Sequence, residues 1–133
     1  MNVKDIYITK SQSERLYNIA KPIIALTGGI ATGKTTVSNY IKDKHQIEIT
    51  DADALIKEIY RQDKTISFIK GRCSTAVING QIDFKILRQS FFSDSNLKNI
   101  IEKFLYAELE ILFKRKVLNS NQNFVLYDVP LLF

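Results

Sequence analysis

Cysteine, histidine and long apolar runs are almost absent from this chain. Cys73 is the only cysteine, which excludes an intrachain disulfide and is typical of a protein in a reducing compartment. No apolar run approaches the roughly 18 residues of a membrane-spanning helix. Lys4, Asp5 and Lys10 interrupt the N-terminal segment, so it lacks the apolar core of a signal peptide. These absences predict a cytoplasmic protein with no membrane partner.

Blocks of like charge are missing as well. The chain has 19 lysines and arginines against 14 aspartates and glutamates, which gives a formal net charge of +5. The basic residues are scattered, and scattered charge is weaker evidence for nucleic acid than a basic stripe or tail. A positive net charge is equally expected of a protein that binds a small polyanion such as ATP. We therefore expect no nucleic-acid partner, and a nucleic-acid-binding ATPase is the alternative.

What the chain does contain is an alternation of short apolar strands and amphipathic helices, within a single-domain length of 133 residues. The predicted strands are residues 23–26, 46–50 and 124–127. The predicted helices start near residue 34 and span residues 54–61, 83–92 and 95–118. Such alternation predicts a parallel sheet with crossover helices, and the first strand should be buried. Asn79-Gly80 predicts a turn.

The first 21 residues have a different pattern and are predicted to form an N-terminal extension. Ser11 and Glu14 have the spacing of a helix capping box, and the apolar residues after them suit one face of a short helix. A partner-binding helix is one interpretation, and an extension that packs on the domain is the simpler one. Residues 22–133 are predicted to form one domain, because no linker divides them.

Residues Gly28–Thr35 fit the phosphate-loop pattern, and they lie between a predicted strand and a predicted helix. Glycines let backbone N–H groups face a phosphate, and the helix adds its positive N-terminal dipole. Lys34 is expected to contact the β- and γ-phosphates of ATP, and the Thr35 hydroxyl to bind Mg²⁺. The residues expected to hold ATP are Gly28, Gly29, Ala31, Thr32, Gly33, Lys34, Thr35 and Thr36.

Three aspartates are expected beside this loop. Asp128 ends the third predicted strand, where a Walker-B-like carboxylate approaches Mg²⁺. Asp51 and Asp53 end the second strand, and the carboxyl ends of parallel strands share one rim with the loop. One of these two acids can cap the next helix while the other takes a proton from an acceptor hydroxyl. We expect Asp53 to be that base. His45 precedes the second strand and is expected to be exposed.

Four segments, in order, resemble motifs of the dephospho-CoA kinases, the family that completes coenzyme A synthesis. They are Leu26–Val37, Asp51–Ile59, Asn79–Asp83 and Asp128–Phe133. The resemblance covers residues 23–133 and implies a three-layer α/β/α P-loop NTPase fold of the nucleoside-monophosphate-kinase type. It also implies transfer of the γ-phosphoryl of ATP, with Mg²⁺, to the 3′-hydroxyl of dephospho-CoA. By match of motif, Asp53 is the base and Lys34 the catalytic lysine.

Some positions depart from the family's pattern. Phe84 stands where arginine is usual, Tyr106-Ala107 where His-Pro is usual, and Gln46 where glycine is usual. Family members also continue past the Asp-Val-Pro block with more strands and an arginine-bearing lid. We therefore expect a sheet that is incomplete at its C-terminal side and leaves an edge exposed, in a monomer or weak homo-oligomer. A non-catalytic remnant that retains nucleotide binding at most, or another P-loop small-molecule kinase, are the alternatives.

Overall fold

The computed structural model describes residues 11–26 and 34–129, with the backbone alone for residues 34 and 35. The predicted loop residues Gly28–Gly33 lie outside the described part of the chain. Two compact units are present. One, the sheet unit, combines Met1–Asp53 with Leu112–Phe133, and the other, the helical unit, is Ala54–Ile111. The chain of the sheet unit is thus interrupted by the helical unit.

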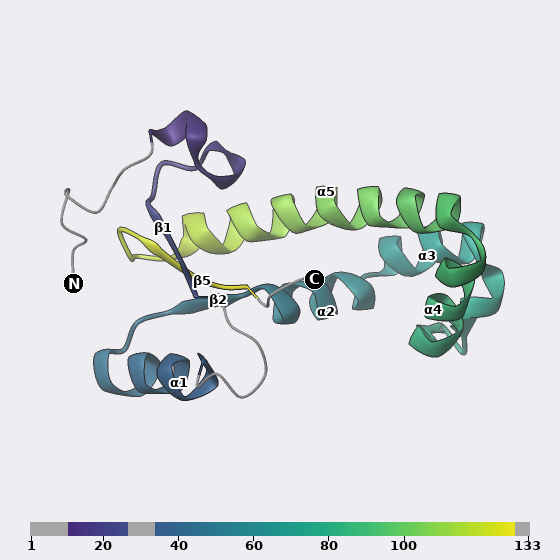
Figure 1. Ribbon diagram of the computed structural model, residues 1–133, viewed down its shortest axis with the longest axis horizontal. Coiled ribbons are helices and arrows are strands. Elements are labelled where there is room, and N and C mark those ends of the chain that lie inside the picture. The colour runs from purple at the N-terminus through teal and green to yellow at the C-terminus, as the bar shows by residue number, and fades with distance from the viewer. Residues whose placement is uncertain (1–10, 27–33, 130–133) are drawn as a thin grey trace. The chain divides into compact units, whose positions relative to one another are not determined.

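The sheet unit contains the predicted parallel sheet (Figure 1). Its strands are β1 (Ile23–Leu26), β2 (Ile49–Asp51) and β5 (Val125–Asp128), in the order β1-β5-β2. The central strand β5 is buried through Tyr127, as its continuous apolar run requires. The expectation that β1 is buried was wrong, because Ile24 is 40% exposed. β1 has one neighbour, β5, within the described residues.

Helix α1 (Lys34–His45) follows the loop, as predicted. Ser38 is buried, whereas the large apolar residues Val37 and Tyr40 are exposed. The helix ends at Gln46, whose φ of +53° is left-handed and whose N–H donates to the Lys42 carbonyl at 3.1 Å. This is the αL C-cap that usually carries glycine.

One face of the sheet is covered by the C-terminal part of helix α5 (Ser95–Asn119). The fully buried Phe113 ring packs edge-on against Tyr127 of β5, at 4.7 Å between centroids. Figure 1 shows α1 on the opposite side of the strands. The sheet unit is therefore the expected α/β/α arrangement, with a parallel sheet between helices.

The N-terminal segment packs on this helical layer. It forms two 3₁₀ turns, Gln12–Glu14 and Leu16–Asn18, instead of the predicted short helix. The Glu14 carboxylate accepts from the Ser11 N–H at 2.8 Å, so the capping interaction predicted from the spacing does form. Tyr17 lies edge-on to Phe113, with ring centroids 5.4 Å apart. Lys21 Nζ donates to the carbonyls of Val117 and Ser120 at 2.8 Å, where a cation stabilises the end of α5.

The helical unit is built from helices and one short hairpin. The elements are α2 (Ala52–Arg61), α3 (Asp63–Arg72), β3 (Val77–Ile78), β4 (Gln81–Ile82), α4 (Phe84–Ser93) and the first part of α5. Its largest fully buried side chains are those of Ile59, Ile69, Leu87, Ile101 and Thr65.

Local sequence signals place most of these elements correctly. Asn79 and Gly80 have φ of +53° and +75°, the left-handed pair of a two-residue hairpin turn. Asp83 Oδ1 accepts from the Ile86 N–H at 3.1 Å and caps α4 as predicted. Helix α3 was not predicted. Its buried residues are Thr65 and Ile69, so packing against the rest of the unit, not an apolar stripe, supports it.

Candidate functional site

The carboxyl ends of the three strands form one rim of the sheet. Leu26 of β1 pairs in register with Asp128 of β5, and Asp128 pairs with Asp51 of β2. The row continues at the rim, because the Leu26 carbonyl accepts from the Val129 N–H at 2.9 Å. Neighbouring strands lie about 4.8 Å apart, so the two aspartates are adjacent. The chain leaves Leu26 into the predicted phosphate loop from this same row.

The two acids at the end of β2 have different surroundings. Asp51 Oδ1 accepts from the Asp53 N–H at 2.9 Å. A carboxylate in this position satisfies an otherwise unpaired N–H in the first turn of α2 and suits the positive end of the helix. Asp51 is therefore the capping acid of the pair. The Asp53 side chain lies in the first helical turn and is exposed.

Helix α1 begins at the end of the predicted phosphate loop. Its first residue is Lys34, and residues 27–33 join it to β1. The first N–H groups of a helix have no partner within it, so this end suits an anion. Thr36 is exposed in the first turn. The remaining predicted ATP contacts, Gly28–Gly33, lie outside the described residues.

The oxygen atoms of the rim fit a hard divalent cation. Asp128 and Asp51 are adjacent carboxylates, and Mg²⁺ is usually held by one or two carboxylates together with substrate phosphates. In the described part of the chain, His, Cys, Asp and Glu form no group of three or more that could hold a metal.

Tyr127 lies one residue before the rim and is buried. Burial, with smaller effects of Tyr17 and the negative charge of Asp51, raises the pKa of Tyr127 to about 12. The Tyr127 phenol therefore keeps its proton to a higher pH than an ordinary tyrosine does.

The remaining residues considered from the sequence lie elsewhere. His45 is exposed at the end of α1, as expected, with its ring 5.9 Å from that of Tyr40. Cys73 Sγ lies 3.4 Å from Ser90 Oγ, and this hydrogen bond lowers the pKa of the thiol despite some burial.

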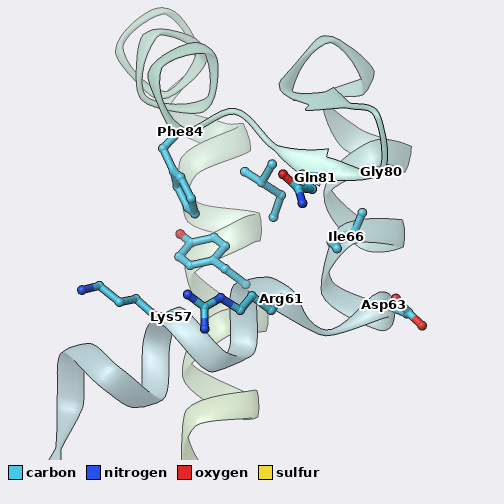
Figure 2. Close-up of a pocket in the computed structure, with 9 residues that line it drawn as sticks. Lys57, Arg61, Asp63, Ile66, Gly80, Gln81 and Phe84 are labelled. Carbon is cyan, nitrogen blue, oxygen red and sulfur yellow. The ribbon is translucent and has the colours of Figure 1, made fainter.

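A pocket in the helical unit was missed by sequence reasoning. It has a volume of about 630 Å³ and lies between α2, α3 and the β-hairpin (Figure 2). Lys57 and Arg61 line it from α2, while Tyr60 and Phe84 form an edge-to-face ring pair 5.0 Å apart. Burial and the negative charge of Glu102 raise the pKa of Tyr60. The sequence signal that could have indicated this pocket is the spacing of Lys57 and Arg61, which lie one helical turn apart on either side of Tyr60.

The profile of a protein family, described as dephospho-CoA kinase, matches residues 22–133. The chain belongs to the dephospho-CoA kinase family. A dephospho-CoA kinase from Synechococcus elongatus is 31% identical over 120 residues, which cover 87% of this chain and 57% of that protein. One from a Wolbachia of Brugia malayi is 36% identical over 115 residues, with coverage of 83% and 58%. The chain thus spans a little over half the length of these dephospho-CoA kinases.

A solved structure supports the fold of this dephospho-CoA kinase family member. The crystal structure of TT1252 from Thermus thermophilus superposes with a TM-score of 0.71 at 26% identity. The match covers 83% of this chain and 56% of TT1252. None of the helices in the described part of the chain is long and apolar enough to cross a membrane.

Proposed function

We propose that this chain transfers the γ-phosphoryl group of ATP to the 3′-hydroxyl of dephospho-CoA. In this proposal residues 22–133 form the kinase domain and residues 1–21 are an extension. The proposal is supported most directly by the shared row of Leu26, Asp128 and Asp51. This row brings the start of the predicted phosphate loop and two carboxylates to one rim. The cytoplasmic location of the protein and its lack of a nucleic-acid partner stay predictions.

On the donor side, we assign the phosphates of ATP to the loop and the first turn of α1. The backbone of the loop and the Lys34 ammonium would neutralise the phosphate charge, and Thr35 and Asp128 would hold Mg²⁺. Bound there, Mg²⁺ would supply positive charge that offsets the charge developing on the phosphates. The assigned contacts are Gly28, Gly29, Ala31, Thr32, Gly33, Lys34, Thr35 and Thr36.

On the acceptor side, we assign the general base to Asp53. The N–H of Asp53 is bound by the Asp51 carboxylate, which anchors the backbone of this residue. The exposed carboxylate of Asp53 itself is then available to accept the proton of a 3′-hydroxyl. Asp51 would thus position the base, and the rest of the rate enhancement would come from orientation and charge neutralisation.

Replacing Asp53 with asparagine tests this assignment. We expect Asp53→Asn to lower kcat by about 10²–10⁴-fold, because general-base catalysis contributes on that order. ATP affinity should not change, since the amide keeps the shape of the side chain. A coupled assay with ATP and dephospho-CoA measures turnover, and calorimetry measures ATP binding.

Asp43→Asn is the matched control, because Asp43 is an exposed acid on α1 and changes the net charge equally. It should leave kcat unchanged. Turnover by Asp53→Asn at the wild-type rate would remove Asp53 as the base.

The second candidate is nucleotide binding without turnover. The chain covers 57% of the length of the Synechococcus relative. Folded wild-type protein that binds ATP but does not phosphorylate dephospho-CoA would favour it. Turnover with another small hydroxyl compound in place of dephospho-CoA would instead favour a different P-loop kinase.

A further inference from the structure

Two adjacent residues of the N-terminal segment have a strained backbone. Tyr17 has a φ of +56° and Asn18 a φ of +54°, and both values lie in the left-handed region. That region is unfavourable for a residue that has a Cβ atom, and asparagine tolerates it better than tyrosine does. Strain of this kind persists where the surrounding contacts fix it, and it is common at clamps and functional sites. The contacts that hold Tyr17 therefore indicate which part of the protein this conformation serves.

The segment is held against the C-terminal part of α5, as Figure 1 shows. The Tyr17 ring lies edge-on to that of Phe113, with the centroids 5.4 Å apart, and the Ile19 side chain is buried. Lys21 Nζ donates at 2.8 Å to two carbonyls at the end of the helix. Residues 11–21, which we call the clamp, are therefore fixed to the C-terminal part of α5.

The clamp is also fixed by hydrogen bonds within itself. Gln12 Nε2 donates to the Asn18 carbonyl at 2.9 Å, and the Arg15 guanidinium donates to the Ala20 carbonyl. These two bonds close the backbone around Tyr17, whose ring takes part in neither of them. The clamp therefore has contacts of its own that keep the backbone of Tyr17 strained and its ring in place.

A chain of three aromatic rings leads from the clamp to the rim. Phe113 contacts both Tyr17 and Tyr127, with 4.7 Å between its centroid and that of Tyr127. Tyr127 directly precedes Asp128, and successive side chains of a strand point to opposite faces of the sheet. Tyr127 therefore points toward α5, and Asp128 points to the face on which α1 lies (Figure 1). This ring chain supports β5 at the point where the strand presents its acid.

The same support reaches the neighbouring strand. Tyr127 pairs in register with Thr50 of β2, one position before the pair formed by Asp128 and Asp51. The pKa of Tyr127 is raised mainly by burial, and to a smaller extent by Tyr17 and by Asp51. The Tyr127 phenol is thus sensitive to the clamp and to the acid rim at the same time.

We propose that Tyr17 is a positioning residue for the rim. Through the ring chain it fixes the strand ends at which Asp51 and Asp128 would bind Mg²⁺ together with the phosphates of ATP. This role rests on the proposed function of the rim, whereas the clamp itself lies outside residues 22–133, which match the family. A clamp that only stabilised the sheet unit would affect the rim no more than the rest of that unit.

Amide hydrogen exchange tests the role of Tyr17 without an activity assay. The variant is Tyr17→Ala, which removes the ring but keeps the Cβ atom, so the backbone strain is unchanged. The N–H groups of Val129 and Asp53 report on the rim, because each is hydrogen-bonded there. Both should exchange at least about tenfold faster than in the wild type, since the rim opens more readily. The N–H of Leu87 in the helical unit should keep its wild-type rate.

A second comparison separates positioning from general stability. The N–H of Val125 is hydrogen-bonded at the other end of β5, next to the part of the clamp that Lys21 holds. It should exchange less than about threefold faster in Tyr17→Ala. Equal acceleration at Val125, Val129 and Asp53 would mean that Tyr17 only stabilises the sheet unit, and would overturn the proposal. Unchanged rates at the rim would overturn it as well.

Two further variants are matched controls. Tyr17→Phe keeps the ring and should show wild-type exchange at the rim, and faster exchange there would contradict a role of the ring. Tyr106→Ala removes a tyrosine of α5 that is 59% exposed and lies outside the ring chain, and it should also leave the rim unchanged. If Tyr17→Ala does not fold, Tyr17→Leu keeps apolar bulk without the ring and replaces it in the same comparisons.

The metal dependence of ATP binding connects the clamp with the function of the rim. ATP is titrated calorimetrically in the presence of Mg²⁺ and, separately, of EDTA. Tyr17→Ala should weaken binding of Mg²⁺–ATP by about fivefold or more, and of metal-free ATP by less than about twofold, because only the former uses the carboxylates. Equal losses in the two conditions would contradict the positioning role. No ATP binding by the wild type would instead overturn the proposed function, while the exchange rates still decide whether Tyr17 orders the rim.

Discussion

The rim of the sheet unit and the pocket of the helical unit differ in how the sequence encodes them. The rim is marked by short contiguous motifs, because a phosphate loop and a strand-ending acid each need neighbouring residues. The pocket is assembled from side chains of α2, α3, the hairpin and the start of α4. Local chemistry can therefore be predicted from a sequence, whereas a cavity between elements emerges only when they pack.

The two units also differ in how their aromatic rings are arranged. In the helical unit Phe68 and Phe104 form a stacked pair with ring centroids 4.2 Å apart. The sheet unit instead joins its layers through a chain of three rings, Tyr17, Phe113 and Tyr127. The predictions below separate these two arrangements and the sites that they carry.

The largest effect is expected from Phe113→Ala. The ring is fully buried and contacts both Tyr17 and Tyr127, so its removal leaves a cavity between the N-terminal segment, α5 and β5. Loss of a buried phenylalanine costs about 3–5 kcal/mol of unfolding free energy. Urea unfolding measures it. Phe92→Ala, which removes a phenylalanine that is 95% exposed, should cost under about 0.5 kcal/mol. Similar losses in the two variants would show that the aromatic chain does not hold the sheet unit together.

The second-largest effect is expected on ATP binding, from a substitution in the predicted phosphate loop. Lys34→Ala should weaken ATP binding by about 10–100-fold, since a charge-assisted hydrogen bond contributes about 1.5–3 kcal/mol. Unfolding by urea should be unchanged. Lys42→Ala, an exposed lysine later in α1, removes the same charge away from the rim and should bind ATP normally. Unaltered ATP affinity in Lys34→Ala would mean that the motif at 28–35 is not a phosphate loop.

The elements of this structure differ in whether they could be predicted from the sequence. Strands 23–26 and 124–127, the Asn79-Gly80 turn and the Asp83 cap were predicted correctly, because each depends on neighbouring residues. The sequence also predicted that either Asp51 or Asp53 caps the next helix, and the structure shows that Asp51 does. Helix α3 and the exposure of β1 were not, because both depend on which elements pack together. The role of Asp53 as a base stays a prediction.

The third effect is a difference in pH dependence between the aromatic core and its surroundings. The pKa of Tyr127 is raised from 10.0 to about 12 by burial, so the folded state holds this proton more tightly than the unfolded chain. The stabilisation is complete below pH 10 and is lost as pH rises toward 12. Between pH 9 and pH 11 we expect a loss of about 1 kcal/mol, measured as the shift of the urea midpoint.

Tyr127→Phe should remove most of this alkaline loss, because phenylalanine does not ionise. Tyr106→Phe is the control, since Tyr106 is 59% exposed. It should keep the wild-type pH profile. An identical alkaline loss in Tyr127→Phe would assign the effect to other groups.

The smallest effect tests the backbone that leads from α1 into β2. Gln46 has a φ of +53°, a conformation that costs a non-glycine residue about 1 kcal/mol but that glycine adopts freely. Glycine also raises the entropy of the unfolded chain, which offsets part of the gain. Gln46→Gly should therefore stabilise the protein by about 0.5 kcal/mol in urea unfolding. Lys44→Gly, in the last helical turn, should instead destabilise it by about 0.5–1 kcal/mol. Both variants introduce glycine, at positions two residues apart. Changes of opposite sign in the free energy of unfolding would identify the backbone conformation at position 46 as the cause. Changes of the same sign would exclude it.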